Sequence, residues 1–108
     1  MTAATADVLR ALLDGGQQDG GGVWGLLIVR STGRPSGTVY PILERLEGAG
    51  WVTSSWESDT GRSGPRRRLY ALGAEGREAA VGALARMAAE DSRRARATTP
   101  GAVQGATA

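Results

Sequence analysis

The sequence has 108 residues, a formal net charge of +2 and neither cysteine nor histidine. This length predicts one small domain, and the missing side chains exclude disulfides, thiolate nucleophiles, imidazole bases and most zinc sites, so no metal or cofactor is expected. All 13 basic residues are arginines, whose planar guanidinium suits phosphate and guanine. No apolar run of about 18 residues and no signal-peptide pattern occurs, which predicts a cytoplasmic protein without a membrane span.

Residues 3–14 are predicted to form a first helix with one apolar stripe. The stripe consists of Val8, Leu9, Leu12 and Leu13. Residues 14–22 contain five glycines, whose backbone entropy disfavours a helix, so a flexible connector is predicted there. No Gly-Lys-Ser/Thr run follows, which argues against a phosphate-binding loop.

Residues 23–32 are strongly apolar, and their pattern alone does not separate a strand from a helix. They lie between the glycine-rich stretch and the turn formed by Thr32, Gly33, Arg34 and Pro35. Because glycine and proline block continuation there, this position favours a nearly buried second helix.

Residues 36–48 are predicted to form a third, short amphipathic helix. Its apolar stripe consists of Val39, Ile42, Leu43 and Leu46. Ser36 is the predicted N-cap, and Gly48 and Gly50 are predicted to end the helix. A helix of this length is not stable alone, so the stripe is expected to dock on the other helices.

Residues 51–57 and 67–72 alternate as two strands, and the intervening residues 58–66 are turn and loop formers. The resulting hairpin needs a helical layer to cover its apolar face. Residues 74–96 are predicted to form a long helix with a shallow stripe of small residues, which suits close helix–helix packing. The fold predicted from this order is α+β, mostly helical: a winged helix-turn-helix over residues 3–73, a dimerisation helix over 74–96 and a disordered tail over 97–108.

The outward face of the third helix and the hairpin loop carry the groups that contact DNA in such folds. Gly37 and the free N–H groups at the helix start suit a phosphate, and four arginines within residues 62–68 make a positive edge. The candidate DNA-binding residues are Arg34, Ser36, Gly37, Thr38, Tyr40, Arg45, Arg62, Arg66, Arg67 and Arg68. Alternatives remain open: Ser36 and Thr38 can cap the helix, Tyr40 can pack partly in the core, and the arginine loop can be only a solvated tip.

Trp24, Trp51 and Trp56 are the large aromatic residues of a chain without phenylalanine. They are expected in the core or in a dimer interface. The alternative is that one or two of them line a site for a flat aromatic effector.

Several stretches of the sequence resemble the PadR-like transcriptional regulators. They are Trp24-Gly25 to Gly33, the Ser36-Gly-Thr-Val-Tyr-Pro-Ile-Leu43 run, Arg45-Leu46-Glu47, Gly50-Trp51-Val52, Trp56-Glu57 and Gly64-Pro-Arg-Arg-Arg-Leu-Tyr70. The resemblance covers roughly residues 5–90. The sequence departs from the family at Leu26 and Leu27, where tyrosine and glutamate are usual, and at Gly73, where threonine is usual.

The resemblance implies a homodimeric winged-helix repressor that binds a palindromic operator in double-stranded DNA. It further implies that the helix after the wing forms the dimer, packed with the first helix. The dimer-interface residues expected on this basis are Val8, Leu12, Val81, Leu84, Met87 and Ala88.

A competing hypothesis is a winged-helix module that binds a protein through its tryptophan and arginine surfaces and does not bind DNA. An enzyme is disfavoured, because the sequence lacks histidine and cysteine and shows no other catalytic constellation. A carboxylate pair at Glu57 and Asp59 is an improbable catalytic site, since it lies in an exposed loop.

Overall fold

The computed structural model of the protein describes residues 1–19, 22–58 and 64–97, which form helices and one small antiparallel sheet. In chain order the elements are α1 (Ala3–Asp19), β1 (Val23–Trp24), α2 (Gly25–Thr32), α3 (Ser36–Gly48), β2 (Val52–Trp56), β3 (Arg68–Leu72) and α4 (Ala74–Ala97). The α+β winged helix-turn-helix is confirmed: α2 and α3 are the helix-turn-helix, and β2 and β3 are the strands of the wing. Of the predicted tail, Ala97 ends α4 and residues 98–108 lie outside the described part.

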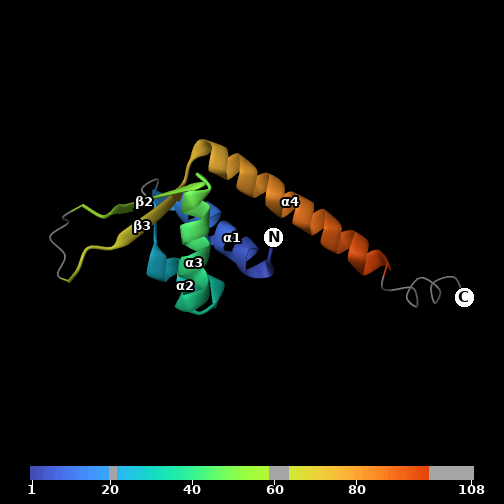
Figure 1. Cartoon of the computed structure of the whole chain (residues 1–108), viewed down its shortest axis with the longest axis horizontal. Helices are drawn as coiled ribbons and strands as arrows, with labels where there is room; N and C mark the ends of the chain where they lie inside the picture. Colours follow the sequence, from blue (N-terminus) through green and yellow to red (C-terminus); the bar gives the residue numbers. More distant parts are fainter. Residues whose placement is uncertain (20–21, 59–63, 98–108) are drawn as a thin grey trace, which may run out of the picture.

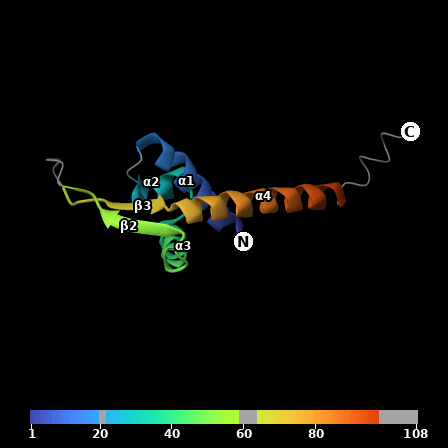
Figure 2. The same cartoon turned by 90° about the horizontal axis from the view of Figure 1, so that it is seen from above.

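The wing and α4 extend in opposite directions from a body made of α1, α2 and α3 (Figure 1). Seen from above, α3 lies on one side of the line formed by the sheet and α4, and α1 and α2 lie on the other side (Figure 2). One face of α3 is therefore covered by the other helices, and its other face is left open.

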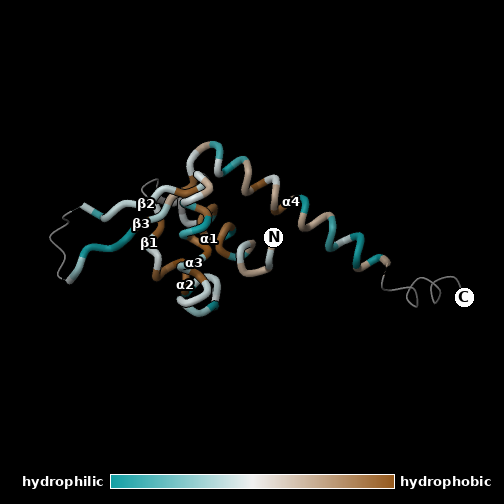
Figure 3. The backbone as a smooth tube through the Cα atoms, in the orientation of Figure 1, coloured by the Kyte–Doolittle hydropathy of each residue, from teal (hydrophilic) through white to brown (hydrophobic). Residues whose placement is uncertain are grey.

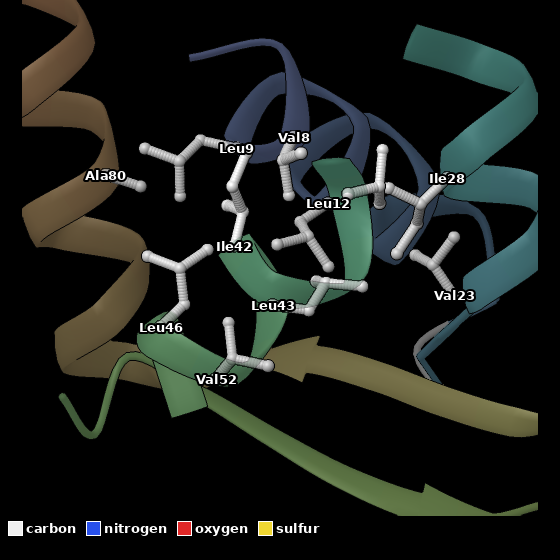
Figure 4. Packing of buried hydrophobic residues seen from close by; sticks show 11 residues of the cluster. Val8, Leu9, Leu12, Val23, Ile28, Ile42, Leu43, Leu46, Val52 and Ala80 are labelled. Carbon is white, nitrogen blue, oxygen red and sulfur yellow. The ribbon is translucent and has the colours of Figure 1, made fainter. Parts of the chain in front are cut away.

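The hydrophobic core lies where the three body helices meet the sheet and the first turns of α4 (Figure 4). Its buried residues are Val8, Leu9, Leu12, Val23, Ile28, Val39, Ile42, Leu43, Leu46, Val52 and Ala80. The predicted stripes of the first and third helices thus face the core. Hydrophobic residues are concentrated at this junction, and the wing and the outer half of α4 are mainly hydrophilic or pale (Figure 3).

The core placement corrects two predicted dimer contacts. Val8 and Leu12 have exposed fractions of 0 % and 2 %, because both pack against α2 and α3 inside the same protomer. Side chains without accessible surface have nothing left to bury against a second chain, so the prediction that they form the dimer interface was wrong.

The sheet has the strand order β1-β3-β2, so the wing is joined by a third strand that the sequence did not predict. Val23 pairs with Tyr70 and Trp24 with Leu69, both antiparallel. The prediction of a helix over all of residues 23–32 was therefore wrong for the first two, and α2 begins at Gly25. Two residues are too few to show a strand period, and their conformation is set by pairing with β3, which lies far along the chain.

The first helix is longer than predicted. It continues to Asp19 through part of the stretch predicted to be a connector, which was therefore wrong for residues 15–19. A Cβ at Gly15 would lie 2.7 Å from Val23 Cγ2, so the missing side chain lets α1 and β1 approach closely. This contact compensates for the low helix propensity of glycine at that position.

The turn between α2 and α3 contains a left-handed glycine and an extended proline. Gly33 has φ 69° and donates its N–H to Val29 O at 3.1 Å, which ends α2. Pro35, not Ser36, is the N-cap of α3, and its carbonyl accepts bonds from Thr38 N at 2.9 Å and Val39 N at 3.1 Å. The predicted Ser36 cap was wrong because the restricted φ of proline already places the chain one residue before the helix.

The end of α3 fixes the start of the wing. Gly50 N–H donates to Glu47 O at 3.0 Å and Trp51 N–H to Leu46 O at 2.9 Å, while Gly50 has φ 83°. This is a Schellman arrangement, in which Gly50 takes the left-handed position. The helix ends at Gly48 as predicted, but Gly48 itself is not left-handed, so Gly50 alone provides the left-handed stop.

The segment between α3 and β2 also contacts the start of α4. Gly73 N–H donates to Trp51 O at 3.1 Å, and a Cβ at Gly76 would overlap that carbonyl group. The first turn of α4 therefore packs backbone to backbone against Trp51, three residues after the end of α3. This contact sets where α4 leaves the body relative to α3.

Candidate nucleic-acid interface

The start of α3 presents an open surface with unbonded amide hydrogens. Ser36 and Gly37 are exposed, Thr38 is half-buried, and no side chain caps the helix. Nothing lies within 4 Å of the position that a Cβ would take at Gly37. A free helix N-terminus without steric cover can accept a phosphate group, as the sequence predicted for these residues.

Tyr40 is partly packed against the body and partly exposed. It is 37 % exposed, and its Cε1 and hydroxyl oxygen would each lie 3.0 Å from a Cβ at Gly25. The Tyr70 ring carbon Cε2 would lie 3.1 Å from the same Cβ. Gly25 thus provides the space in which two tyrosines meet, and the rest of the Tyr40 ring lies next to the wing.

The two arginines predicted around α3 differ in their surroundings. Arg45 is exposed on the outer face of the helix. Arg34 donates from Nε to Asp7 Oδ2 at 2.8 Å, and Asp7 also accepts from Arg10 Nη1 at 3.1 Å. Arg34 therefore joins α1 to the turn before α3, and a DNA contact would have to use the 35 % of its side chain that is exposed.

The arginines of the wing have three different environments. Arg66 is exposed. The Arg67 guanidinium lies 3.8 Å from the ring centroid of Trp24, and the Arg68 guanidinium lies 4.9 Å from that of Trp56. Both stacks are cation–π contacts, which restrict the two arginines without removing their charge. Arg62, the fourth predicted arginine, lies outside the described residues.

Arg68 also takes part in a polar chain that connects the wing to the end of α3. Its Nη2 donates to Ser54 Oγ at 2.8 Å, and Ser54 Oγ donates to Glu47 Oε2 at 2.6 Å. Charge-assisted hydrogen bonds are stronger than neutral ones. This chain therefore stabilises the wing base against the helix whose other end carries the candidate DNA contacts.

The wing arginines and α3 meet around one hollow of about 270 Å³. It is lined by Trp24, Tyr40, Pro65, Arg66, Arg67 and Arg68. The structure thus brings together residues predicted to bind DNA that come from α3 and from the wing. Positive side chains and a tyrosine hydroxyl on one surface can contact successive phosphates of a DNA backbone.

The three tryptophans do not line a common site. Trp24 borders the hollow. Trp51 directly precedes β2 and is half-buried against the core. Trp56 is the last residue of β2 and is 62 % exposed beside Arg68. Of these three residues, Trp24 lies at the hollow that the wing arginines also line.

Tyr70 lies on the central strand next to this region. Burial raises the pKa of Tyr70, and the nearby Arg68 guanidinium opposes that shift. At neutral pH the Tyr70 hydroxyl is therefore protonated and can serve as a hydrogen-bond donor.

The remaining predicted dimer residues lie along α4. Val81 is 53 % exposed, Ala88 is exposed, and Leu84 and Met87 are half-buried. A cleft of about 460 Å³ separates Met1 from the second half of α4, where Met87 lies in its wall. These residues are accessible to a second chain, unlike those of α1.

Within residues 1–19, 22–58 and 64–97, no group of three or more histidine, cysteine or acidic residues is arranged to hold a metal ion. The helices in that part of the chain are too short or too polar to span a bilayer.

The sequence profile of the transcriptional regulator PadR-like family matches residues 25–81, which is more than half of the chain. These residues contain the helix-turn-helix, the wing and the base of α4. The chain belongs to the PadR-like family. It is a DNA-binding transcription regulator, and its family is one of regulators rather than of enzymes. No curated protein sequence matches it significantly.

Solved structures of regulators share the fold. A PadR family regulator from Clostridium difficile R20291 is 19 % identical, with a TM-score of 0.61 over 94 % of this chain and 99 % of that one. A MarR family regulator from Rhodococcus sp. RHA1 is 20 % identical, with a TM-score of 0.69 over 99 % and 69 %. Bordetella bronchiseptica BpsR, whose DNA binding is regulated by 6-hydroxynicotinic acid, is 26 % identical, with a TM-score of 0.65 over 99 % and 74 %.

Sequence reasoning missed several residues that shape this PadR-like interface. Gly25 and Glu47 were named only as part of the family resemblance, Ser54 was given no role, and Trp24 was not expected to contact a wing arginine. The alternation of residues 51–57 placed Ser54 on the face of Val52, but no local signal indicated its bonds to Glu47 and Arg68. Those partners lie in two other elements, so only the folded structure shows them.

Proposed function

We propose that this PadR-like chain is a repressor that binds a palindromic operator as a homodimer, through α3 and the wing of each subunit. The observation that carries the proposal is the hollow at which Arg66, Arg67 and Arg68 meet Tyr40. In this mode the N-terminal half of α3 enters the major groove and the wing lies on the flanking backbone. Ser36, Gly37, Thr38 and Arg45 are accessible for that contact.

The dimer is supported by the form of α4. Its first turns pack on the body, where Gly76 and Ala80 are buried, and from Val81 to Ala88 the helix leaves an apolar edge exposed. Alanine- and arginine-rich helices without tertiary contacts have marginal stability in water. A second copy of α4 would bury this edge, and the two-fold axis would place two α3 helices about one turn of DNA apart, roughly 34–36 Å.

Repression follows from occupancy of the operator, because two wings and two recognition helices on one DNA face exclude other proteins from it. A reporter gene behind the chain's own upstream region tests this directly. Repression predicts higher expression without the protein than with it, and activation predicts the reverse.

DNA binding is tested by fluorescence anisotropy with the upstream region and with a scrambled duplex of equal length. The expected result is selective binding whose logarithm of affinity falls linearly with the logarithm of salt concentration. Arg66→Ala should weaken binding to all sequences and reduce the slope by about one unit for each lost phosphate contact. Arg93→Ala, which removes an equally exposed arginine from the outer half of α4, is the matched control. If both variants have the same slope of log affinity against log salt concentration, the wing does not contact DNA phosphates.

A flat aromatic effector stays a prediction of this proposal. It is motivated by Trp24, which borders the hollow, and by BpsR, which responds to 6-hydroxynicotinic acid. Titration of the chain with 6-hydroxynicotinic acid, followed by tryptophan fluorescence and by release of bound DNA, tests it.

A further inference from the structure

Arg67 is restricted both at its side chain and at its backbone. Its guanidinium stacks 3.8 Å from the Trp24 ring centroid, and its Nε is covered and has no hydrogen-bond partner within the described residues. Its backbone is bonded as well: Arg67 N–H donates to Glu57 Oε1 at 3.2 Å, and its carbonyl accepts from Glu57 N at 2.8 Å. A guanidinium whose face is covered by a ring and whose Nε is covered has fewer donors to offer a phosphate than the exposed Arg66 has.

Trp24 is the second residue of β1, and strand pairing fixes its position. It pairs with Leu69 on β3, directly after the wing arginines, and it is followed at once by the first residue of α2. Arg67 lies two residues before Leu69, the strand partner of Trp24, so its side chain is on the face of Trp24, while the intervening Arg68 stacks on Trp56. The stack therefore connects the base of the wing to the helix-turn-helix through a side chain that lies between them.

The wing depends on contacts outside its own hairpin for a fixed orientation. It is a hairpin of two five-residue strands, and an isolated hairpin of that size is at most marginally stable in water. The third strand, β1, adds two residues of pairing to it. Without the Trp24 stack, the outer part of the wing would keep its charges but lose its fixed direction relative to α3.

We infer that Trp24 is a positioning residue for DNA binding: its ring orients Arg67 and with it the wing, so that Arg66 reaches a backbone phosphate while α3 occupies the groove. The inference rests on the proposed DNA-binding function and deepens it, because it assigns different roles to adjacent arginines. Arg66 is the phosphate contact, and Arg67 acts through the direction of the wing.

The test uses two substitutions at Trp24 in the full chain. Trp24→Leu removes the aromatic face, and Trp24→Phe keeps one. Removal of a cation–π contact should weaken DNA binding by between about twofold and thirtyfold. The salt slope of Trp24→Leu should equal that of the wild type, since no phosphate contact is lost. Trp24→Phe should recover most of the affinity, and Arg66→Ala should reduce the slope.

Two outcomes of these titrations overturn the inference. Equal affinities for Trp24→Leu and the wild type would show that the stack does not position the wing. A salt slope reduced by about one unit in Trp24→Leu would make Arg67 a phosphate ligand rather than an orienting residue. Unfolding of each variant is followed by circular dichroism, and the Phe variant keeps the test valid if the Leu variant is unstable.

A measurement without DNA separates this inference from the proposed function. In the NMR spectrum of the free protein, ring currents of Trp24 should displace the Arg67 Hε signal, and Trp24→Leu should abolish the displacement. An Arg67 signal at the position of a free arginine in the wild type would refute the stack even if DNA binds. A displaced signal in a chain that shows no salt-sensitive DNA binding would refute the proposed function and leave the stack in place.

Discussion

The wing and α4 both project from the same helical body, but they are stabilised in different ways. The wing has contacts with the body on two sides: Arg67 stacks on Trp24, and Arg68 bonds Ser54, which in turn bonds Glu47 of α3. The outer half of α4 has ion pairs within the helix itself, from Arg94 to Glu90 at 3.0 Å and to Asp91 at 3.5 Å.

This difference affects how much conformational freedom each projection would lose on binding. A wing whose direction is fixed before binding loses less conformational freedom on a rigid duplex, and such preorganisation increases affinity. Surface ion pairs within one helix contribute little, about 0–1 kcal/mol, so the proposed second chain would add most of the stability of the outer half of α4. On the proposed function, the first projection binds DNA and the second binds another copy of the chain.

The largest expected effect concerns the base of α4. In Gly76→Ala the new methyl group would overlap the Trp51 carbonyl, and the helix or the corner after α3 would have to shift. We expect a loss of about 3 kcal/mol or more in the free energy of unfolding, measured by urea denaturation. Gly82→Ala in the same helix is the control: its nearest neighbour is the flexible end of Arg86 at 3.4 Å, and it should be neutral or stabilising by up to about 1 kcal/mol. Similar losses in both variants would mean that α4 is not anchored at Gly76.

The next effect tests the need of α4 for a partner. Val81→Glu places a charge in the exposed apolar edge, where burial against a second chain would cost several kcal/mol. Sedimentation velocity should show a monomer in place of a dimer, and operator affinity should fall because the two half-sites no longer bind together. Ala89→Glu, an exposed position off the edge, controls for the added charge. A dimer that survives Val81→Glu would place the interface elsewhere.

The regions that the sequence predicted well are those whose signals are local. The stripe from Val39 to Leu46 defined α3 and its buried face, and Gly33 marked the turn before it. Strand alternation and the arginine-rich turn formers defined the wing. In each case the residues that determine the conformation lie within one element, so spacing alone was sufficient.

Apart from the N-cap of α3, which the neighbouring Pro35 sets locally, the errors have a common physical cause, which is contact between distant parts of the chain. Pairing with β3 makes Val23 and Trp24 a strand, and the contact with Val23 accommodates a glycine inside α1. Val8 and Leu12 were assigned to a dimer interface by resemblance, although the core of this compact protomer already buries them. The stack of Arg67 on Trp24 likewise joins residues separated by most of the domain, which no local pattern encodes.

A smaller effect is expected when the polar chain of the wing is removed. Ser54→Ala deletes the hydroxyl that bonds both Arg68 and Glu47, and a hydrogen bond contributes about 0.5–1.5 kcal/mol to stability. Thermal unfolding should show a loss in that range and the DNA affinity should fall slightly. Ser55→Ala, on the exposed face of the same strand, should leave both unchanged. If the two variants behave alike, the chain from Arg68 to Glu47 does not stabilise the wing.

The smallest effect concerns the pH dependence of the central strand. Burial raises the pKa of Tyr70 above its usual value, so the folded chain retains this proton longer than the unfolded chain does. The stability that the protonated Tyr70 contributes to the folded chain is complete below the unfolded pKa of about 10. It is lost as the pH rises through the higher folded pKa. Urea unfolding at pH 7 and at several values above about pH 10 should therefore show a smaller alkaline decline for Tyr70→Phe than for the wild type. The difference between the two proteins at pH 7 measures the cost of removing the hydroxyl itself. Parallel curves at alkaline pH would show that burial of Tyr70 does not distinguish its two protonation states, and that the wing approaches the body less closely than its stacks and hydrogen bonds indicate.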